Sequence, residues 1–327
     1  MLFRSTSDSL DASRPAAMPR GECLPEYGNR FGGVVAAAIT PCSAVGVVDP
    51  PALTRLCRIL IDQGCDGVLV LGSSGELPML DEDDRRELTA AASEGVGPAA
   101  TLYAGVTGFG LKQTIRHAEN AAADGADAAV VMVPMMLKFS QDELAAYGCA
   151  VADASPIPVA LYHHLRMPTP FQVDTVARLA QHGNIVAMKD TSVDMARLGA
   201  LLEATAGTGM AIMQGSERLF LDSLRAGAAG CISALATVAP EWHADLCRAM
   251  AAGDDDAAEA HQRRITALWQ VFGHDLLGQS FSCFAYAVKR MLQHRGWLEH
   301  TYGLMPGFSP PPELDHVVLE QLLAVEL

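Results

Sequence analysis

From residue 33 onward, short apolar runs alternate regularly with longer amphipathic stretches, and this alternation leaves few possible folds. Runs that are apolar throughout are typical of parallel strands buried on both faces, and the stretches between them are typical of connecting helices. We expect eight strands, at residues 34–40, 67–71, 101–105, 128–133, 158–162, 185–189, 210–214 and 230–233.

Capping signals predict where several of the helices begin. Asp49 precedes Pro50, and Ser140 is followed three residues later by Glu143, which is the spacing of a capping box. In the helix after the third strand, residues at helical spacing predict the side that faces the sheet, namely Leu111, Ile115, Ala118 and Ala122.

Eight strand–helix units can form an open, doubly wound sheet or a closed barrel. Polar side chains gather at or just after the predicted strand ends, at Thr40, Ser73, Ser74, Tyr162, Lys189 and Ser233. A barrel fills its interior with apolar side chains and carries its chemistry at the carboxyl ends of the strands. The polar strand ends therefore predict an α/β fold of the (β/α)8 TIM barrel type.

The pattern changes on both sides of this barrel, which is assigned to residues 31–238. Residues 1–30 are rich in Ser, Arg, Ala and Pro and lack the apolar segment of a secretory signal, so they are predicted to be a disordered tail. After the eighth strand only helical patterns follow, near residues 239–252, 255–272 and 279–294. Residues 239–327 are therefore predicted to form a C-terminal helical extension.

Composition argues against several kinds of partner. Hydrophobic residues make up 50% of the chain and charged residues 19%, so a large core can form. The formal net charge of −15 disfavours binding to nucleic acid. No apolar run approaches the roughly 20 residues of a membrane-spanning helix. The eight cysteines include no C-x-x-C pair, so we expect reduced thiols, a cytoplasmic location and no zinc ribbon.

Lys189 ends the apolar run Ile-Val-Ala-Met-Lys, so its amine is expected at the mouth of the barrel. Burial there disfavours the ammonium form and leaves a neutral amine that can attack a carbonyl carbon. Tyr162 ends the preceding strand, and a phenol beside an amine can transfer protons. The alternatives are a lysine that reaches solvent along its methylene stem and a tyrosine that only packs.

The segment Gly72-Ser-Ser-Gly-Glu76 follows the second strand and offers two hydroxyls and turning backbone N–H groups to an anion. This combination suits a small carboxylate, although an ordinary turn before a helix has the same composition. His163 and His164 are adjacent, and consecutive residues do not converge on a metal as spaced ligands do. We expect no metal.

At these residues the chain resembles the dihydrodipicolinate synthase/N-acetylneuraminate lyase family of class I aldolases. The matching pieces run in order from about residue 33 to the C-terminal helices. They are Ile39-Thr40-Pro41 with Asp49, Gly72-Ser-Ser-Gly-Glu76, Leu161-Tyr162, Val186-Ala-Met-Lys-Asp190, Gly215-Ser-Glu217, and Gly230-Cys-Ile-Ser233 through Val238-Ala-Pro240.

The resemblance implies a barrel with a helical extension, no cofactor, and usually a homotetramer, with a homodimer as the alternative. It implies a Schiff base between Lys189 and pyruvate or a related 2-oxo acid, proton transfer by Tyr162, and carboxylate binding by Ser73 and Ser74. Thr40 is assigned to the substrate site, and Ser233 to packing or pocket lining. Gly215 and Glu217 match a loop that contacts the distal part of the substrate in sialic acid lyases.

The chain departs from the family pattern at two places. Family synthases carry Pro-Tyr-Tyr after the fourth strand, where this chain has Pro134-Met135-Met136, so the proton relay through that tyrosine is absent. Met136 is expected to line the pocket mouth and to favour substrates with an apolar distal part. The loop after Tyr162 is also unusual, and Arg166 lies one place away from the arginine that binds the aldehyde's carboxylate in synthases.

These observations favour a carbon–carbon or carbon–oxygen lyase, of the aldolase or dehydratase type, that acts on a 2-oxo acid through Lys189. Two alternatives stay open. One is condensation of the dihydrodipicolinate synthase type, for which the two methionines predict poor activity. The other is a non-catalytic protein that binds or senses a 2-oxo acid on the same fold.

Overall fold

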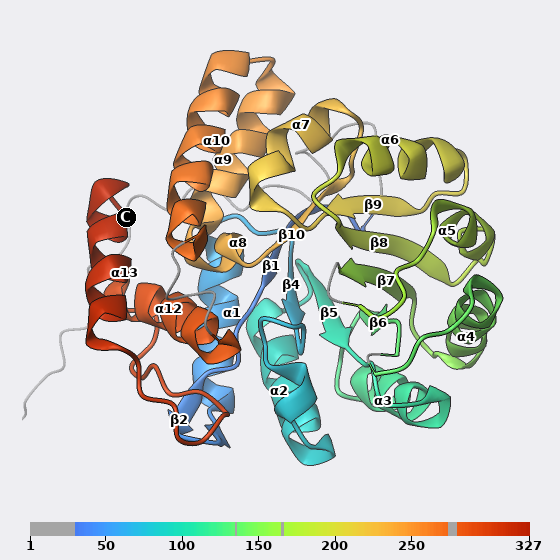
Figure 1. Cartoon of the computed structure of the whole chain (residues 1–327), viewed down its shortest axis with the longest axis horizontal. Coiled ribbons are helices and arrows are strands. Elements are labelled where there is room, and N and C mark those ends of the chain that lie inside the picture. Colours follow the sequence, from blue (N-terminus) through green and yellow to red (C-terminus); the bar gives the residue numbers. More distant parts are fainter. Residues whose placement is uncertain (1–29, 135, 165–166, 274–279) are drawn as a thin grey trace, which may run out of the picture.

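In the computed structural model, residues 30–134, 136–164, 167–273 and 280–327 are described. Eight parallel strands form a closed barrel in the order β1-β10-β9-β8-β7-β6-β5-β4 (Figure 1). The barrel confirms the predicted TIM architecture and excludes the open sheet. The strands are β1 (Gly33–Ala37), β4 (Gly67–Val70), β5 (Thr101–Gly105), β6 (Ala128–Met132), β7 (Val159–His164), β8 (Ile185–Thr191), β9 (Ala211–Gln214) and β10 (Gly230–Ser233).

Helices surround the barrel, and two of the predicted capping signals operate in them. The Asp49 side chain accepts a hydrogen bond from the Ala52 backbone, and Ser140 and Glu143 form a complete capping box. The helices of the ring are α1 (Pro50–Asp62), α2 (Glu82–Val96), α3 (Leu111–Ala123), α4 (Gln141–Ala154), α5 (Val173–Leu179), α6 (Met195–Ala204) and α7 (Phe220–Arg225), with the short turns η1 (Leu77–Met79) and η2 (Glu217–Leu219).

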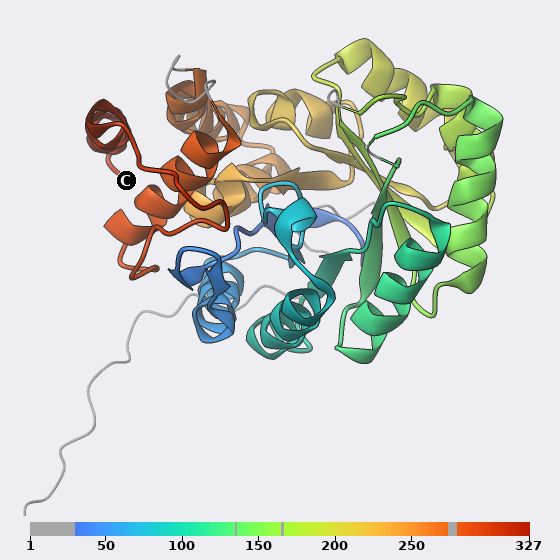
Figure 2. The same ribbon diagram turned by 60° about the horizontal axis from the view of Figure 1, so that its bottom comes forward.

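Further helices follow β10 and gather on the side of the barrel near β1 and β10, where they are coloured orange and red (Figures 1 and 2). They are α8 (Leu235–Val238), α9 (Pro240–Ala252), α10 (Asp255–Trp269), the turn η3 (Gln270–Gly273), α12 (Phe281–His294) and α13 (Pro312–Ala324). Within the described part of the chain, no helix is both long and apolar enough to cross a bilayer.

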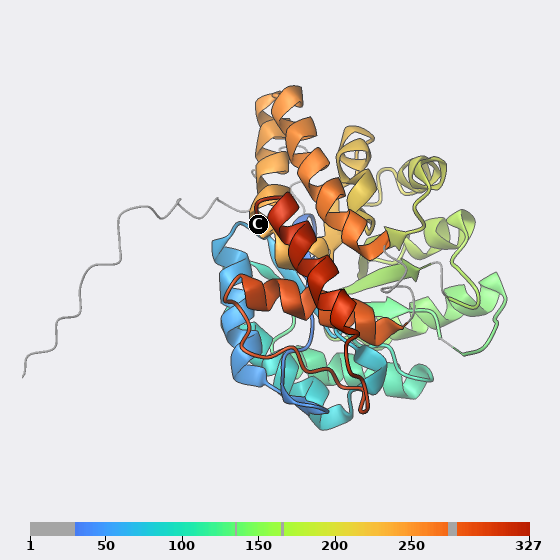
Figure 3. The same cartoon turned by 60° about the vertical axis from the view of Figure 1, so that its left-hand side comes forward.

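The structure differs from the sequence-based expectation at several elements. The buried face of α3 consists of Thr114, His117, Ala118 and Ala121, and Leu111 is exposed, so the predicted stripe was wrong at its start. Ile115 and Ala122 of that stripe are half-buried, and the buried His117 contacts Arg85 of the neighbouring helix α2. The hairpin of β2 (Cys42–Ala44) and β3 (Val47–Val48) and the last helix, α13, were not predicted. In Figure 3, α13 runs across α12, against which it packs.

The predicted boundary between residues 238 and 239 falls between α8 and α9. The predicted disordered tail lies outside the described residues, apart from Arg30.

Candidate active site

Lys189 lies on β8 beside Tyr162 of β7. The two residues are direct partners in the parallel ladder, so their side chains point to the same face of the barrel. The Lys189 side chain is 6% exposed, and its Nζ lies 4.6 Å from the centroid of the Tyr162 ring. The amine is therefore held in a largely dry site against an aromatic ring.

A third strand end adds a hydroxyl to this pair. Tyr162 Oη and Ser73 Oγ lie 3.1 Å apart and share a hydrogen bond, although they are 89 residues apart in the sequence. Ser74 is half-buried in the same turn. The structure thus brings together Lys189, Tyr162 and Ser73, which the sequence analysis selected separately.

The turn from Gly72 to Glu76 has an unusual backbone on both sides. Leu71 and Glu76 have φ values of 55° and 59°, in the left-handed region that residues other than glycine rarely adopt. Thr40 Oγ1 donates a 2.6 Å hydrogen bond to the carbonyl of Gly75. Thr40 therefore holds the turn in place, and residues held in such backbone conformations cluster at functional sites.

The C-terminal extension also holds this turn, through a buried ion pair that the sequence analysis missed. Lys289 of α12 donates a hydrogen bond to Glu76 Oε1 over 2.8 Å, and the two side chains are 0% and 4% exposed. The backbone N–H of Leu304 donates to the other carboxylate oxygen of Glu76 over 3.0 Å, and Lys289 also donates to the carbonyl of Tyr302. The charge of Glu76 is thus fully paired.

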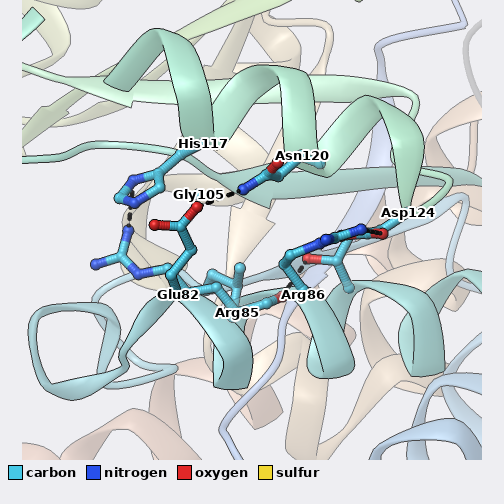
Figure 4. A pocket seen from close by; sticks show the side chains of 10 residues that line it. Glu82, Arg85, Arg86, Gly105, His117, Asn120 and Asp124 are labelled. Carbon is cyan, nitrogen blue, oxygen red and sulfur yellow. Dashed lines mark hydrogen bonds and ion pairs between the residues drawn. The ribbon is translucent and has the colours of Figure 1, made fainter. Parts of the chain in front are cut away.

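Behind the turn, Arg85 ties α2 to the neighbouring elements (Figure 4). Its guanidinium donates to the carbonyl of Leu77, the first residue of η1, and to that of Leu80, which follows η1. It also contacts His117 Nδ1 at 3.0 Å. Burial and the adjacent Arg85 lower the pKa of His117. The cavity between these groups is about 10 Å³, which is about the space of one water molecule. We interpret this cluster as a brace for the turn.

A larger cavity of about 380 Å³ opens beside Ser73 and Tyr162. Its lining combines a few polar side chains with methionine, proline and phenylalanine; the residues are Ser73, Glu76, Pro78, Met79, Met132, Tyr162, His164, Met167, Pro168 and Phe281. Met136 is 74% exposed and is not in this lining, and Arg166 lies outside the described residues. The apolar wall therefore comes from residues other than the predicted Met136.

The ends of β8 and β9 approach each other closely at Gly215. A Cβ atom on this residue would lie 2.1 Å from Thr191 Oγ1, so only glycine fits. Gly215 N donates to the carbonyl of Asp190 over 2.7 Å, and Arg197 of α6 donates to the Asp190 carboxylate over 2.8 Å. Gly215 thus allows close packing next to the strand that carries Lys189.

Glu217 and Ser233 form a second buried cluster, at the end of β10. Glu217 Oε1 accepts hydrogen bonds from Ser233 Oγ over 3.0 Å and from the backbone N–H of Ala234 over 3.1 Å. Ser233 Oγ in turn accepts from the backbone of Ala236, and it lies 3.4 Å from Nε2 of the buried His243. These contacts hold β10 and the start of α8 together, and the role of both residues toward substrate stays a prediction.

His163 and His164 point in different directions from β7. His164 lines the large cavity and makes an edge-to-face contact with Tyr162, at a centroid distance of 6.0 Å. His163 is buried, and its Nδ1 has no hydrogen-bond partner among the residues that the structure describes. Burial is the main cause that lowers the pKa of His163; the Asp190 carboxylate opposes the shift, and the Arg197 guanidinium adds to it.

Fold and site together define a (β/α)8-barrel enzyme with a buried lysine–tyrosine pair beside a hydroxyl-bearing turn. The family model described as the dihydrodipicolinate synthetase family matches residues 30–310. The chain belongs to this family and is a lyase.

Curated relatives and solved structures agree with this assignment. The chain is 37% identical over 240 residues to the 4-hydroxy-tetrahydrodipicolinate synthase of Mycolicibacterium paratuberculosis, a match that covers 73% of this chain and 79% of the relative. It is also 37% identical to 4-hydroxy-tetrahydrodipicolinate synthase 1 of Streptomyces coelicolor, over 73% of this chain and 77% of the relative.

Among solved structures, the prophage protein YagE of E. coli K12, which belongs to the dihydrodipicolinic acid synthase family and was solved in complex with pyruvate, matches with a TM-score of 0.85 and 26% identity. This match covers 91% of this chain and 99% of that structure. The dihydrodipicolinate synthase of Aquifex aeolicus matches with a TM-score of 0.82 and 28% identity, over 91% and 99% of the two chains.

Proposed function

We propose that the chain catalyses carbon–carbon or carbon–oxygen bond cleavage in a 2-oxo acid, or the reverse reaction, through a Schiff base on Lys189. The observation that carries this proposal is the buried amine 4.6 Å from the Tyr162 ring, with the Tyr162 hydroxyl bonded to Ser73. The structure of a family member in complex with pyruvate supports the choice of a 2-oxo acid.

The chemistry needs no group beyond the side chains of the chain. The Lys189 amine attacks the C2 carbonyl carbon, and loss of water gives an iminium ion that withdraws electrons from C3. In a 4-hydroxy-2-oxo acid, the C4 hydroxyl then gives up its proton and the C3–C4 bond breaks. This releases an aldehyde and leaves an enamine, which takes a proton at C3. Water finally hydrolyses the iminium ion and restores the amine.

Tyr162 and the serine turn have separate roles in this scheme. The Tyr162 phenol carries protons to and from the C2 oxygen and the reacting carbons, because its ring lies against the Lys189 amine and its hydroxyl is bonded to Ser73. Ser73 and Ser74 offer their hydroxyls to the substrate carboxylate. Thr40 keeps the turn in the conformation that presents them.

A substrate panel tests the proposal. The panel contains 2-oxo-3-deoxy sugar acids, 4-hydroxy-2-oxo acids and sialic acid, assayed with the wild type, Lys189→Ala, and Lys112→Ala as an exposed-lysine control. We expect turnover of at least one compound, lost in Lys189→Ala and kept in Lys112→Ala. Binding without turnover for every compound would instead favour the non-catalytic sensor.

A second candidate is condensation of pyruvate with aspartate semialdehyde, and the names of the curated relatives favour it. Against it, Met135 and Met136 replace the family's tyrosine pair, and a thioether cannot donate a proton. We expect a low kcat/KM with these two substrates. A value at or above about 10⁴ M⁻¹s⁻¹, which is common for enzymes, would establish this second candidate.

We also propose that the chain forms a homo-oligomer and that it is located in the cytoplasm. A homotetramer or homodimer follows from the family resemblance, and the cytoplasm follows from the cysteine pattern. Sedimentation of the purified chain and fractionation of its host cells test them.

A further inference from the structure

We propose that the large cavity is an acceptor subsite for an apolar group, so that the preferred substrate is a 4-hydroxy-2-oxo acid with an alkyl or aryl substituent on C4. This inference rests on the proposed Schiff-base function and adds the class of the second substrate, an apolar aldehyde. It depends on residues that the sequence analysis did not consider.

The first support is the distribution of polarity around the cavity. Six of the ten described lining residues are apolar, and we call them the apolar wall: Pro78, Met79, Met132, Met167, Pro168 and Phe281. Ser73 and Tyr162 also line the cavity and share a hydrogen bond, and the Tyr162 ring centroid lies 4.6 Å from Lys189 Nζ. A 2-oxo acid would therefore have polar partners for its carboxylate and carbonyl, whereas a group attached further along would meet methionine, proline and phenylalanine.

The second support is charge. Among the described lining residues there is no lysine or arginine, and the acidic residue, Glu76, is already paired with Lys289. Against these described residues, a carboxylate on the acceptor would lose hydration without gaining a cationic partner from them, and such desolvation is costly. An alkyl or aryl group would gain free energy from the same burial.

The third support is that two apolar lining side chains are partly exposed, and that one of them packs on further aromatic rings. Phe281 and Met79 both line the cavity and are 40% and 41% exposed. The ring of Phe281 packs on Phe284 at 5.7 Å, and Phe284 packs on Phe272 at 5.1 Å. Binding of an apolar ligand to such a surface removes apolar area from water on both sides, and this burial favours the complex.

The size of the cavity fits an acceptor in addition to the 2-oxo acid. Its volume of about 380 Å³ lies within the roughly 300–1,000 Å³ of pockets that hold small organic ligands larger than pyruvate.

In the condensation direction, the enamine formed from Lys189 and pyruvate attacks the aldehyde carbon through its C3 atom. The new C3–C4 bond forms, and the aldehyde oxygen takes up one proton to become the C4 hydroxyl. Water then hydrolyses the iminium ion, releases the 4-hydroxy-2-oxo acid and regenerates the amine. Cleavage is the reverse of these steps, and neither direction needs an oxidant or reductant.

A matched pair of aldehydes tests the inference. Pentanal and succinate semialdehyde share the first three carbons of the chain, and they differ in an ethyl group against a carboxylate. With pyruvate as donor, we expect kcat/KM for pentanal to exceed that for succinate semialdehyde by at least about tenfold, which is a typical discrimination by an apolar pocket. Phe281→Ala should lower this ratio by about tenfold, and comparing variants cancels the intrinsic reactivity of the aldehydes.

Two controls separate the possible failures. Leu323→Ala removes an exposed apolar side chain from α13, which contributes no residue to the described lining, and should keep the wild-type ratio. Exchange of the pyruvate C3 hydrogens in deuterium oxide reports the enamine without any acceptor. If exchange occurs but the wild-type ratio is one or less, the acceptor subsite is refuted while the Schiff-base function stands.

Two other outcomes would also overturn the inference. A high ratio that Phe281→Ala does not change would mean that this wall does not select the substrate. Absence of exchange would refute the Schiff-base function and the acceptor subsite together.

Discussion

The phenol of Tyr162 lies between the amine of Lys189 and the hydroxyl of Ser73. Its ring is 4.6 Å from the amine, and its oxygen is 3.1 Å from Ser73 Oγ. Removal of this single oxygen leaves the ring packing of the buried side chain nearly intact. The position therefore allows the chemical role of the hydroxyl to be separated from its structural role.

We expect Tyr162→Phe to lower kcat by about 10²–10⁴-fold, the usual contribution of a positioned acid or base. Steady-state kinetics on the best substrate of the panel would measure the loss, and circular dichroism would verify the fold. A rate within a few-fold of the wild type would mean that Tyr162 only packs against the lysine.

His163 predicts how stability depends on pH. Because its pKa is lowered in the folded protein, the unfolded chain binds more protons between the folded pKa and the usual value of about 6.5. The stability that depends on neutral His163 is fully present above that usual value, and it is lost as the pH falls through the folded pKa. Asp190 and Arg197 are the charged groups that act on it.

We therefore expect the melting temperature of the wild type to fall as the pH is lowered from 7.5 toward 5, and to fall less steeply in His163→Leu. The dependence of the melting temperature on pH should decrease only in part in this variant, because His117 and His243 also have lowered pKa values. His294→Leu, at an exposed position in the last turn of α12, should keep the wild-type slope. Equal slopes in all three proteins would rule out the role of His163.

Sequence reasoning selected residues that the structure brings together wherever the strand end itself gave the signal. Lys189 and Tyr162 were found because each ends an apolar run, and Ser73 because it lies in a Gly/Ser turn. Phe281 and Met79 carried no such signal, since an isolated apolar residue is indistinguishable from core. Glu76 and Lys289 are 213 residues apart, so their pairing could be seen only in three dimensions.

At the level of elements, α12 reaches from the C-terminal extension to the turn after β4. It supplies Lys289 to Glu76 and Phe281 to the cavity wall. The extension thus contributes to the candidate active site as well as packing on the barrel.

Among the contacts between elements, the Glu76–Lys289 ion pair is the one whose loss we expect to lower the free energy of unfolding most. We expect Lys289→Met to destabilise the protein by about 3–5 kcal/mol, because it leaves the Glu76 carboxylate buried without its cation. Glu76→Gln combined with Lys289→Met should recover most of this loss, since it removes the unpaired charge. Urea unfolding of both variants measures the difference.

An exposed pair supplies the control for this experiment. Arg263 and Glu259 lie 3.8 Å apart on α10, and their side chains are 70% and 50% exposed. Arg263→Met should change the free energy of unfolding by less than about 1 kcal/mol. A similar small effect in Lys289→Met would show that the buried pair contributes little.

Element boundaries were predicted best where burial alone determines them. The ranges 101–105 and 230–233 agree with β5 and β10 to the residue, since both strands are apolar or small throughout. β7 and β8 each extend two residues beyond the predicted ends. In the ladder, His163 pairs with Asp190 and His164 pairs with Thr191. Polar residues after an apolar run are typical of a loop in a single sequence, so these strand residues were not predicted.

For the molecule as a whole, the periodic sequence predicted eight strand–helix units, and the polar strand ends favoured the closed barrel over an open sheet. The packing of the C-terminal helices on one side was not predictable. It depends on contacts such as that of Tyr286 in α12 with Asp315 in α13, which no local pattern encodes.

The central claim, that Lys189 forms the Schiff base, can be tested on the intact protein because lysine is rare in it. The three other lysines are Lys112 and Lys138, which are exposed, and Lys289, which is held in the ion pair. The protein is incubated with pyruvate, reduced with borohydride and digested, and the peptides are mapped by mass spectrometry. We expect one pyruvate-derived adduct, on Lys189. Absence of an adduct, or an adduct on another lysine with Lys189 unmodified, would contradict the account.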